Sequence, residues 1–418
     1  MNRRHALRAA AIFGLPWQKA FAAGSTNTAP LPPESLFKQD SEAYWNRIRE
    51  EQFYLPKWRA FLNNGSLGVA PKPVLAVVTD YLEKSAALEL DYPYPRWGYE
   101  TLDEYREELA KFLSCKKDEL ALMHNATEAL STVAAGIDLK PGDEVIMTDQ
   151  EHVSGKSGWM QKQARFGITV KTVAIPLPPK SPEQLADLMI SAIGPKTRVI
   201  VFSGITSPTG LIMPIRQICD AARAKGVISV VDGAHMHGQI HAPISELNCD
   251  YLTGSPHKWM FAPAGAGFLY IREEMLDRTW PMCVTGDWDN KSLKAARFMR
   301  MGTNNRAIFE GMIAGLRFAQ SIGHDRIQAR IHHLARHTFE RAKRLPYIEL
   351  LTPDNDQMFG SLVAIRFKVD SGKVWEETGK RKIFVSGGQQ VRLSSHIHTR
   401  PSDIDQLFDI IEEKLGHA

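Results

Sequence analysis

Apolar and polar positions follow two different periods along this chain. Leu102, Tyr105, Leu109 and Phe112 recur at helical spacing, which predicts an amphipathic helix. After them, short β-rich apolar runs alternate with helical stretches such as 183–193; the runs are residues 120–123, 144–148, 170–175, 199–203, 227–231 and 267–271. Strands that alternate with helices in this way predict a largely parallel α/β sheet.

From about residue 300 the pattern changes. A long polar helix is predicted at 325–345, and strands are predicted at 361–369 and 390–394. The chain then closes with a helix whose apolar residues are Ile404, Leu407, Phe408, Ile411 and Leu415. This mixture predicts a second, smaller α+β domain.

The change of pattern suggests a division of the chain. We predict a large domain at 61–299 and a small C-terminal domain at 300–418. Residues 24–40 are rich in Pro, Ser and Thr, which is typical of a linker or exposed arm. Residues 24–60 are therefore predicted to form a linker and an N-terminal arm.

The first 23 residues have the layout of an export signal. A basic start is followed by a short apolar stretch at 9–15 and by a small-residue end, Ala-Phe-Ala-Ala. The adjacent Arg3 and Arg4 favour the twin-arginine route, which predicts a periplasmic protein. The alternative is a frayed basic N-terminus on a cytoplasmic protein.

Charge and composition narrow the classes of function. The formal net charge is +4, but four basic residues and no acidic residue lie in residues 1–23. The remainder is neutral, which gives no sign of a basic stripe for nucleic acid. Hydrophobic residues make up 44% of this 418-residue chain and charged residues 23%, as in ordinary globular proteins. No apolar run approaches the roughly 20 residues that span a bilayer, so no membrane span is expected.

Cysteine usage excludes two further classes. The four cysteines are spread widely along the chain, at Cys115, Cys219, Cys249 and Cys283. Such spacing is neither a disulfide framework nor a CxxC zinc site. Two His-x-His pairs, at 235–237 and 396–398, are expected to line or rim a pocket rather than to hold a metal.

Residues with chemical potential gather at the ends of the predicted strands, where open α/β sheets bind ligands. Residues 125–129, Asn-Ala-Thr-Glu-Ala, follow one strand and open a helix, so they could bind phosphate or act as a plain cap. His152, after Glu151, could stack on a ring. Asp232 ends an apolar strand, where a carboxylate must be paired.

Two more features lie further along. Residues 255–259, Ser-Pro-His-Lys-Trp, follow another strand end and contain Lys258. A lysine in a partly apolar pocket has a lowered pKa and becomes nucleophilic. Residues 302–304, Gly-Thr-Asn, form a turn that could reach an adjacent active site.

In this order, the five motifs resemble the class V aminotransferases. These enzymes are a branch of the fold-type I enzymes that use pyridoxal phosphate. The resemblance runs from about residue 62 to the end. The stretches 62–68 and 207–210 are similar to the isopenicillin N epimerase-like subgroup. The resemblance implies a fold-type I α/β architecture with a mostly parallel seven-stranded sheet and a smaller α+β domain.

The resemblance also implies roles around the cofactor ring. Lys258 would hold the cofactor aldehyde covalently and, once released, move the α-proton of an amino acid. Asp232 would pair with the ring nitrogen and keep it protonated, and His152 would stack on the ring. His235 stands where the family usually has a glutamine that donates to the ring hydroxyl.

Phosphate and substrate contacts follow from the same resemblance. The phosphate would be held by Ala126, Thr127, Ser255 and His257. Thr303 would reach the phosphate of the neighbouring subunit, which implies a homodimer with shared active sites. Arg392 would bind the substrate α-carboxylate through its guanidinium fork, and Asn64 would be a second substrate contact.

Several activities share this chemistry. Transamination, epimerisation and C–S or β-elimination all begin at the α-carbon of the bound amino acid. We expect an epimerase or aminotransferase, with an elimination lyase as the alternative. A cysteine desulfurase needs a nucleophilic cysteine in the C-terminal region, and the last cysteine is Cys283. A non-catalytic binding module is the non-enzyme alternative, and the joint retention of Lys258, Asp232 and Arg392 argues against it.

Overall fold

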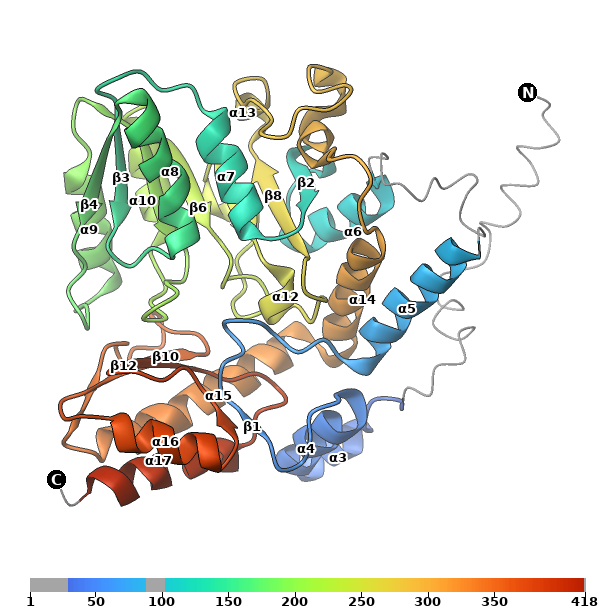
Figure 1. Cartoon of the computed structure of the whole chain (residues 1–418), viewed down its shortest axis with the longest axis vertical. Coiled ribbons are helices and arrows are strands. Elements are labelled where there is room, and N and C mark those ends of the chain that lie inside the picture. The colour runs from blue at the N-terminus through green and yellow to red at the C-terminus, as the bar shows by residue number, and fades with distance from the viewer. Residues whose placement is uncertain (1–28, 88–101, 417–418) are drawn as a thin grey trace.

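The computed structural model describes residues 29–87 and 102–416. A large α/β part stands above a smaller part that contains the C-terminal residues (Figure 1). The predicted division at residue 300 stays a prediction. In the described part of the chain no helix is both long enough and apolar enough to cross a bilayer.

A seven-stranded sheet forms the centre of the large part. Its spatial order is β2-β8-β7-β6-β5-β3-β4, and β8 runs antiparallel to both of its neighbours while the other neighbouring pairs are parallel. The strands are β2 (Leu120–Met123), β3 (Glu144–Thr148), β4 (Thr169–Val173), β5 (Thr197–Ser203), β6 (Ile228–Asp232), β7 (Tyr251–Gly254) and β8 (Gly267–Ile271). This confirms the predicted mostly parallel sheet. Four of the strands, β2, β5, β7 and β8, are almost entirely buried, which explains their continuous apolar runs.

Helices connect and cover these strands. Figure 1 shows α7, α8 and α10 against the sheet, with α5, α6 and α14 beyond β2. The helices of this part are α5 (Lys72–Ala86), α6 (Asp103–Leu113), α7 (Ala126–Gly136), α8 (Val153–Phe166), α9 (Pro182–Ala192), α10 (Ile215–Ala224), α11 (Ile244–Leu247), α12 (Pro256–Trp259), α13 (Glu273–Leu276) and α14 (Ala307–Ile322). Short 3₁₀ segments lie at Lys117–Glu119 and Lys291–Met299.

The smaller part is built on an antiparallel sheet. Its order is β12-β10-β9, formed by β9 (Ile348–Leu350), β10 (Leu362–Phe367) and β12 (Gln390–Ser394). The helices of this part are α15 (His324–Lys343), α16 (Gly372–Lys380) and α17 (Pro401–Leu415). Ile404, Leu407 and Phe408 of α17 are fully buried against this sheet, so the amphipathic pattern of the last helix matches its packing.

The N-terminal residues are not an extended arm over the range the structure describes. They form α3 (Glu34–Gln39) and α4 (Ser41–Gln52) before β1 (Ala60–Phe61), which pairs in parallel with β11 (Ile383–Phe384). Tyr44, Trp45 and Ile48 of α4 are buried in one cluster with Phe261 and Phe318. This cluster joins α4 to α14 and to the loop after α12.

Candidate active site

The candidate site lies where β6 and β7 end, as expected for an α/β sheet. Asp232 is the last residue of β6, and Lys258 lies in α12, which follows β7 after Ser255. Helices α7 and α8 begin at this edge, and β12 approaches from the smaller part with Arg392. The fold therefore brings together residues from both sheets.

Lys258 is a half-buried amine with a polar neighbour. Its Nζ lies 3.1 Å from Nε2 of His235. The pKa of Lys258 is lowered to about 8, mainly by burial; the carboxylate of Asp232 opposes this shift and the positive charge of Arg392 adds to it. A larger share of neutral amine is thereby present near neutral pH, as a nucleophile or base requires.

Asp232 is buried, with 5% of its surface exposed. Among the described residues, the amide of Ala234 donates to Oδ1 at 2.9 Å. Gly155 of α8 lies opposite: a Cβ atom at this position would stand 3.8 Å from Oδ2 of Asp232. A glycine at this point leaves room in front of the second carboxylate oxygen, which suits a flat cationic ring.

A second buried carboxyl group supports this edge. Glu151 accepts hydrogen bonds from the hydroxyl of Ser203, at 2.6 Å, and from the hydroxyl of Thr148. The pKa of Glu151 is raised to about 7, mainly by burial; the hydrogen bonds from Ser203 and Thr148 oppose this shift and the nearby charge of Asp232 adds to it. Sequence analysis located Glu151 at the strand end but assigned it no role. Its position next to His152 was the one feature of the sequence that could have pointed to it as a site residue.

His152 is the N-cap of α8. Its Nδ1 accepts a hydrogen bond from the amide of Ser154 at 3.2 Å, which fixes the ring at the start of the helix. The residue is exposed. Burial of the ring and the charges of Lys258 and Arg392 lower the pKa of His152, so the ring is neutral near pH 7. A neutral, exposed ring is free to stack on another ring.

The start of α7 lies at one end of the candidate site. Asn125 caps the helix through a bond from the amide of Glu128 at 2.9 Å, and the amide of Ala126 donates to the Ser255 hydroxyl oxygen at 3.2 Å. Thr127 is exposed at the second helical position. Amides and hydroxyls at a helix N-terminus suit phosphate.

His257 faces the same region from α12. Its Nδ1 lies 2.8 Å from the carbonyl oxygen of Ala266, so Nδ1 carries a proton and the neutral ring presents Nε2 as an acceptor. Burial lowers the pKa of His257. The neutral ring therefore presents no N–H to a phosphate oxygen, and the predicted phosphate contact of His257 stays a prediction, whereas the Ser255 hydroxyl keeps a proton to donate.

Arg392 is held by two separate segments. Its Nη1 donates to the carbonyl and hydroxyl oxygens of Ser207, at 2.8 and 3.1 Å, and its Nη2 lies 3.2 Å from both Asn63 Oδ1 and Ser66 Oγ. Burial lowers the pKa of Arg392 to about 10, which leaves it charged at neutral pH. Sequence reasoning missed Ser66, Asn63 and Ser207 as partners of this guanidinium.

Residues 62–68 form a strap between the two parts. Asn64 is fully buried: its Nδ2 donates to the Lys258 carbonyl at 2.7 Å, and its Oδ1 lies 3.3 Å from Nε2 of His398. The predicted contact of Asn64 with substrate stays a prediction, and Asn63 faces Arg392 instead. A Cβ atom at Gly65 would stand 3.1 Å from Arg392 and 3.3 Å from His235, so glycine allows the strap to pass between them.

Thr303 lies apart from these contacts. It is exposed in the turn that precedes α14. Its predicted contact with the phosphate of a partner subunit stays a prediction.

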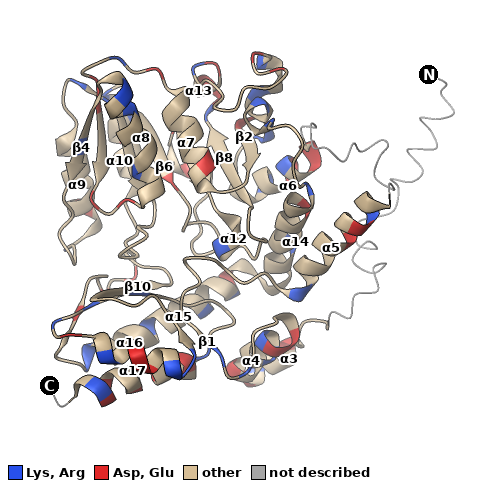
Figure 2. Ribbon diagram, in the orientation of Figure 1, with Lys and Arg blue, Asp and Glu red and all other residues tan. Residues whose placement is uncertain are grey.

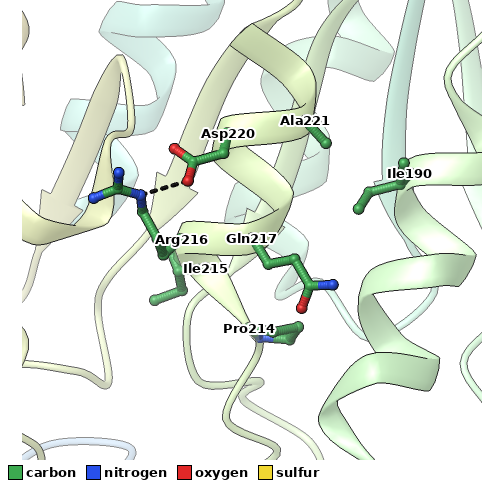
Figure 3. A pocket seen from close by; sticks show the side chains of 7 residues that line it. All are labelled: Ile190, Pro214, Ile215, Arg216, Gln217, Asp220 and Ala221. Carbon is green, nitrogen blue, oxygen red and sulfur yellow. Dashed lines mark hydrogen bonds and ion pairs between the residues drawn. The ribbon is translucent and has the colours of Figure 1, made fainter. Parts of the chain in front are cut away.

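Other surface features do not add to the site. A shallow hollow between α9 and α10 is lined by Ile190, Pro214, Ile215, Arg216, Gln217, Asp220 and Ala221 (Figure 3). None of these residues belongs to the set around Lys258. Charged residues of both signs are interspersed over the two parts (Figure 2). In the described ranges, no three His, Cys, Asp or Glu side chains gather as they would to hold a metal ion.

The residues present fit pyridoxal phosphate. A buried carboxylate lies beside Gly155, which has no side chain, an amine with a lowered pKa lies nearby, and a helix N-terminus with a hydroxyl lies at the other end. Lys258 would hold the aldehyde, Asp232 the ring nitrogen, and the α7 start with Ser255 the phosphate. This donor set matches the three functional groups of the cofactor.

Comparison with known proteins gives the same result. Residues 61–403 match the family model described as aminotransferase class-V. The chain is 30% identical to the isopenicillin N epimerase of Streptomyces clavuligerus over 382 residues, which cover 85% of this chain and 94% of that protein. It is also 30% identical to the isopenicillin N epimerase of Amycolatopsis lactamdurans, covering 88% and 98% of the two chains.

A solved structure confirms the fold. The apo cysteine desulfurase from Thermococcus onnurineus NA1 superposes with a TM-score of 0.78 at 22% identity, covering 94% of this chain and all of that one. The chain therefore has the fold-type I architecture. It belongs to the class-V aminotransferase family of pyridoxal-phosphate enzymes.

The Arg392 geometry leads to a prediction. Arg392→Lys should raise KM for a carboxylate-bearing substrate by about 100-fold with a smaller change in kcat, because a lysine cannot make two parallel bonds to a carboxylate. Arg366→Lys, on the neighbouring strand β10, is the matched control and should change KM little. Steady-state kinetics measure both, and an unchanged KM in Arg392→Lys would remove this residue from substrate binding.

Proposed function

We propose that this enzyme removes and returns the α-proton of an amino-acid substrate, as an epimerase. The observation that carries this proposal is a lysine whose pKa burial lowers to about 8, hydrogen-bonded to His235, with the Arg392 guanidinium and the His235 ring both next to Gly65. The two isopenicillin N epimerases, 30% identical over most of the chain, support the same reaction class. Transamination begins with the same proton removal and is the other outcome of the test below.

The residues divide the work by charge and position. Arg392 binds the substrate carboxylate and so orients the α-carbon. Lys258 takes the α-proton on the lone pair of Nζ, and the centre is inverted when a solvent-derived proton is added to the opposite face of the α-carbon. Pyridoxal phosphate, when bound, supplies the electron-withdrawing ring that makes this proton acidic. Asp232 holds the ring nitrogen in its protonated form, and His152 keeps the ring in place.

Three of the four cysteines are poorly suited to desulfuration. Proteins named as cysteine desulfurases are among the relatives, for example a probable one of Pyrococcus abyssi at 24% identity over 381 residues. Cys219 and Cys249 are buried, and burial raises the pKa of Cys219 to about 12. Burial likewise raises the pKa of Cys115 to about 12. A buried thiol in this state is a poor nucleophile.

Isotope exchange tests the proposed reaction. The holoenzyme should be incubated in deuterium oxide with a panel of L- and D-amino acids. Deuterium at Cα with loss of optical purity, and without conversion of the cofactor to its pyridoxamine form, is expected for an epimerase. Stoichiometric pyridoxamine formation would instead mark a transaminase. Release of ammonia and a keto acid would mark an elimination lyase, and no exchange with any substrate would favour the binding-module alternative.

We infer that the active unit is a homodimer. Large apolar side chains lie exposed shortly before the Thr303 turn, at Trp280, Met282, Val284 and Trp288, and exposed apolar clusters of this kind mark interaction surfaces. If Thr303 completes the partner's phosphate site, cofactor binding stabilises the dimer by linkage. Cofactor-free protein should then dissociate at higher concentration than holoenzyme in sedimentation equilibrium. Thr303→Ala should weaken both assembly and cofactor binding, whereas Thr172→Ala on the exposed β4 should weaken neither.

We also propose export by the twin-arginine route. Its signal, residues 1–23, lies outside the described residues, so the proposal depends on the sequence alone. A folded, cofactor-loaded cargo suits this route. Replacing Arg3 and Arg4 by Lys should retain active protein in the cytoplasm, as measured by activity in cell fractions. Normal appearance of that variant in the periplasm would contradict the twin-arginine assignment.

A further inference from the structure

His235 is a buried imidazole with a partner at each ring nitrogen. The indole Nε1 of Trp259 lies 3.2 Å from Nδ1, and the Nζ of Lys258 lies 3.1 Å from Nε2. His235 is 3% exposed and Trp259 is 1% exposed. Two consecutive residues of α12 thus contact the two nitrogens of one histidine.

The chemistry of indole fixes the proton on this ring. An indole N–H is only a donor, so Nδ1 of His235 must be the acceptor and carries no proton. In a neutral ring the proton then sits on Nε2, which faces Lys258. A doubly protonated ring would set two N–H donors, from Trp259 and from Nδ1, against each other. The ring is therefore the neutral Nε2–H tautomer.

This tautomer determines what Lys258 can be. Nε2–H can donate only to a nitrogen with a free lone pair, and Nζ has one only as the neutral amine. An ammonium group would face the N–H of His235 and find no acceptor there. We propose that His235, with its tautomer fixed by the Trp259 indole, donates to Nζ of Lys258 and thereby favours its neutral, reactive form over the ammonium.

The charges around the pair agree with this assignment. Arg392 and Lys258 lower the pKa of His235, after burial, and the neighbouring rings of His152 and His257 act in the same direction. Around Lys258, burial and Arg392 lower the pKa, and the carboxylate of Asp232 opposes them. His396 stacks on the Trp259 ring, with 5.6 Å between the ring centroids. This packing keeps the indole N–H in position.

The tautomer itself can be measured on the full-length, cofactor-free protein. Histidine labelled with ¹⁵N gives different shifts for protonated and unprotonated ring nitrogens, and His235→Gln identifies the His235 signals by their loss. We expect His235 to carry its proton on Nε2 and not on Nδ1 between about pH 6 and 9. A proton on Nδ1, or an imidazolium, at neutral pH would overturn the proposal.

The effect on Lys258 needs a variant and a control. Competitive labelling with acetic anhydride, read by mass spectrometry of the Lys258 peptide, gives the pH at which Nζ becomes neutral, expected at about 8 in the native chain. Trp259→Phe removes the donor to Nδ1 and lets Nε2 accept from an ammonium group, so the midpoint should rise by at least about one pH unit. Trp159→Phe is the matched control, because Trp159 is equally buried and its Nε1 has no partner among the described residues.

An unchanged midpoint in Trp259→Phe, with the variant folded by circular dichroism, would overturn the proposal. If that variant does not fold, the tautomer measured in the native chain still decides the matter. The inference rests on the proposed function only in that the neutral amine of Lys258 serves to move the α-proton. A correct tautomer and midpoint without α-proton exchange would contradict the proposed function alone, and exchange with the other tautomer would contradict this inference alone.

Discussion

Lys258→Ala is expected to reduce turnover by at least about 10⁴-fold. The change removes both the covalent attachment point and the base, and general base catalysis alone contributes about 10²–10⁴-fold. The fold should persist, because α12 is held through its backbone: Asn64 donates to the Lys258 carbonyl at 2.7 Å, and the amide of Gly68 donates to the His257 carbonyl at 3.0 Å. The variant should still bind cofactor through the phosphate end of the site.

The measurement is product formation per active site, together with absorbance of bound cofactor. Lys171→Ala, an exposed lysine on β4, is the control and should match the native rate. Multiple turnovers at near-native rate in Lys258→Ala would contradict the assignment of Lys258. Loss of cofactor from the variant would show instead that the phosphate contacts are too weak to hold it alone.

Sequence periodicity predicted the central sheet well because its strands are buried. The predicted strands at 120–123, 144–148 and 267–271 coincide with β2, β3 and β8. Strand β7 (Tyr251–Gly254) was inferred only as a strand end before Ser255 and had no predicted range, since Thr253 and Gly254 interrupt its apolar run. Thr253 is nonetheless fully buried between β6 and β8, and a four-residue strand placed by its neighbours leaves little local signal.

The N-terminal helices show a different limit. Prolines near residue 30 suggested an arm, yet α4 buries Tyr44 and Trp45 against residues nearly 300 positions away. Its charged surface is also matched at long range: Arg330 of α15 pairs with Glu42. Helix α4 is stabilised by tertiary packing, and such contacts cannot be read from local spacing.

The candidate site divides in the same way. Asp232, His152 and Lys258 sit in local motifs at strand ends, so sequence alone could bring them together. The partners of Arg392 come from residues 63–66 and from Ser207. Together with Arg392 itself, these are three segments that only the folded chain joins. The tautomer of His235 likewise depends on Trp259, which follows Lys258 in the same motif. The sequence contains this tryptophan but could not show that its indole N–H points at His235.

Asp232→Asn is the second change with a large expected effect. A contacting charge pair at an effective dielectric of about 20 is worth about 4 kcal/mol, and its loss corresponds to a rate of α-proton removal lower by about 10³-fold. The amide has no negative charge to hold a proton on the ring nitrogen. We therefore expect a folded enzyme that binds cofactor and substrate but exchanges the α-proton slowly.

The fold should tolerate this substitution for a specific reason. Oδ1 of Asp232 accepts a bond from the Ala234 amide at 2.9 Å, and the side-chain oxygen of asparagine can accept the same bond. The amide nitrogen of asparagine would take the place of Oδ2, next to Gly155. An amide group is about the same size as a carboxylate, so it fits there. Thermal unfolding should thus change little, which separates a chemical effect from a structural one.

The decisive readout is the rate of deuterium exchange at Cα, with Asp220→Asn as control because that carboxylate pairs with Arg216 on the surface of α10. Exchange in Asp232→Asn within a few-fold of the native rate would mean that Asp232 serves only to cap the turn after β6. A large loss of exchange with native unfolding temperature and native cofactor content would assign its charge to the reaction. The contrast works because Asp232 changes the acidity of the α-proton while Arg392 changes substrate affinity, so the two variants should separate along kcat and KM.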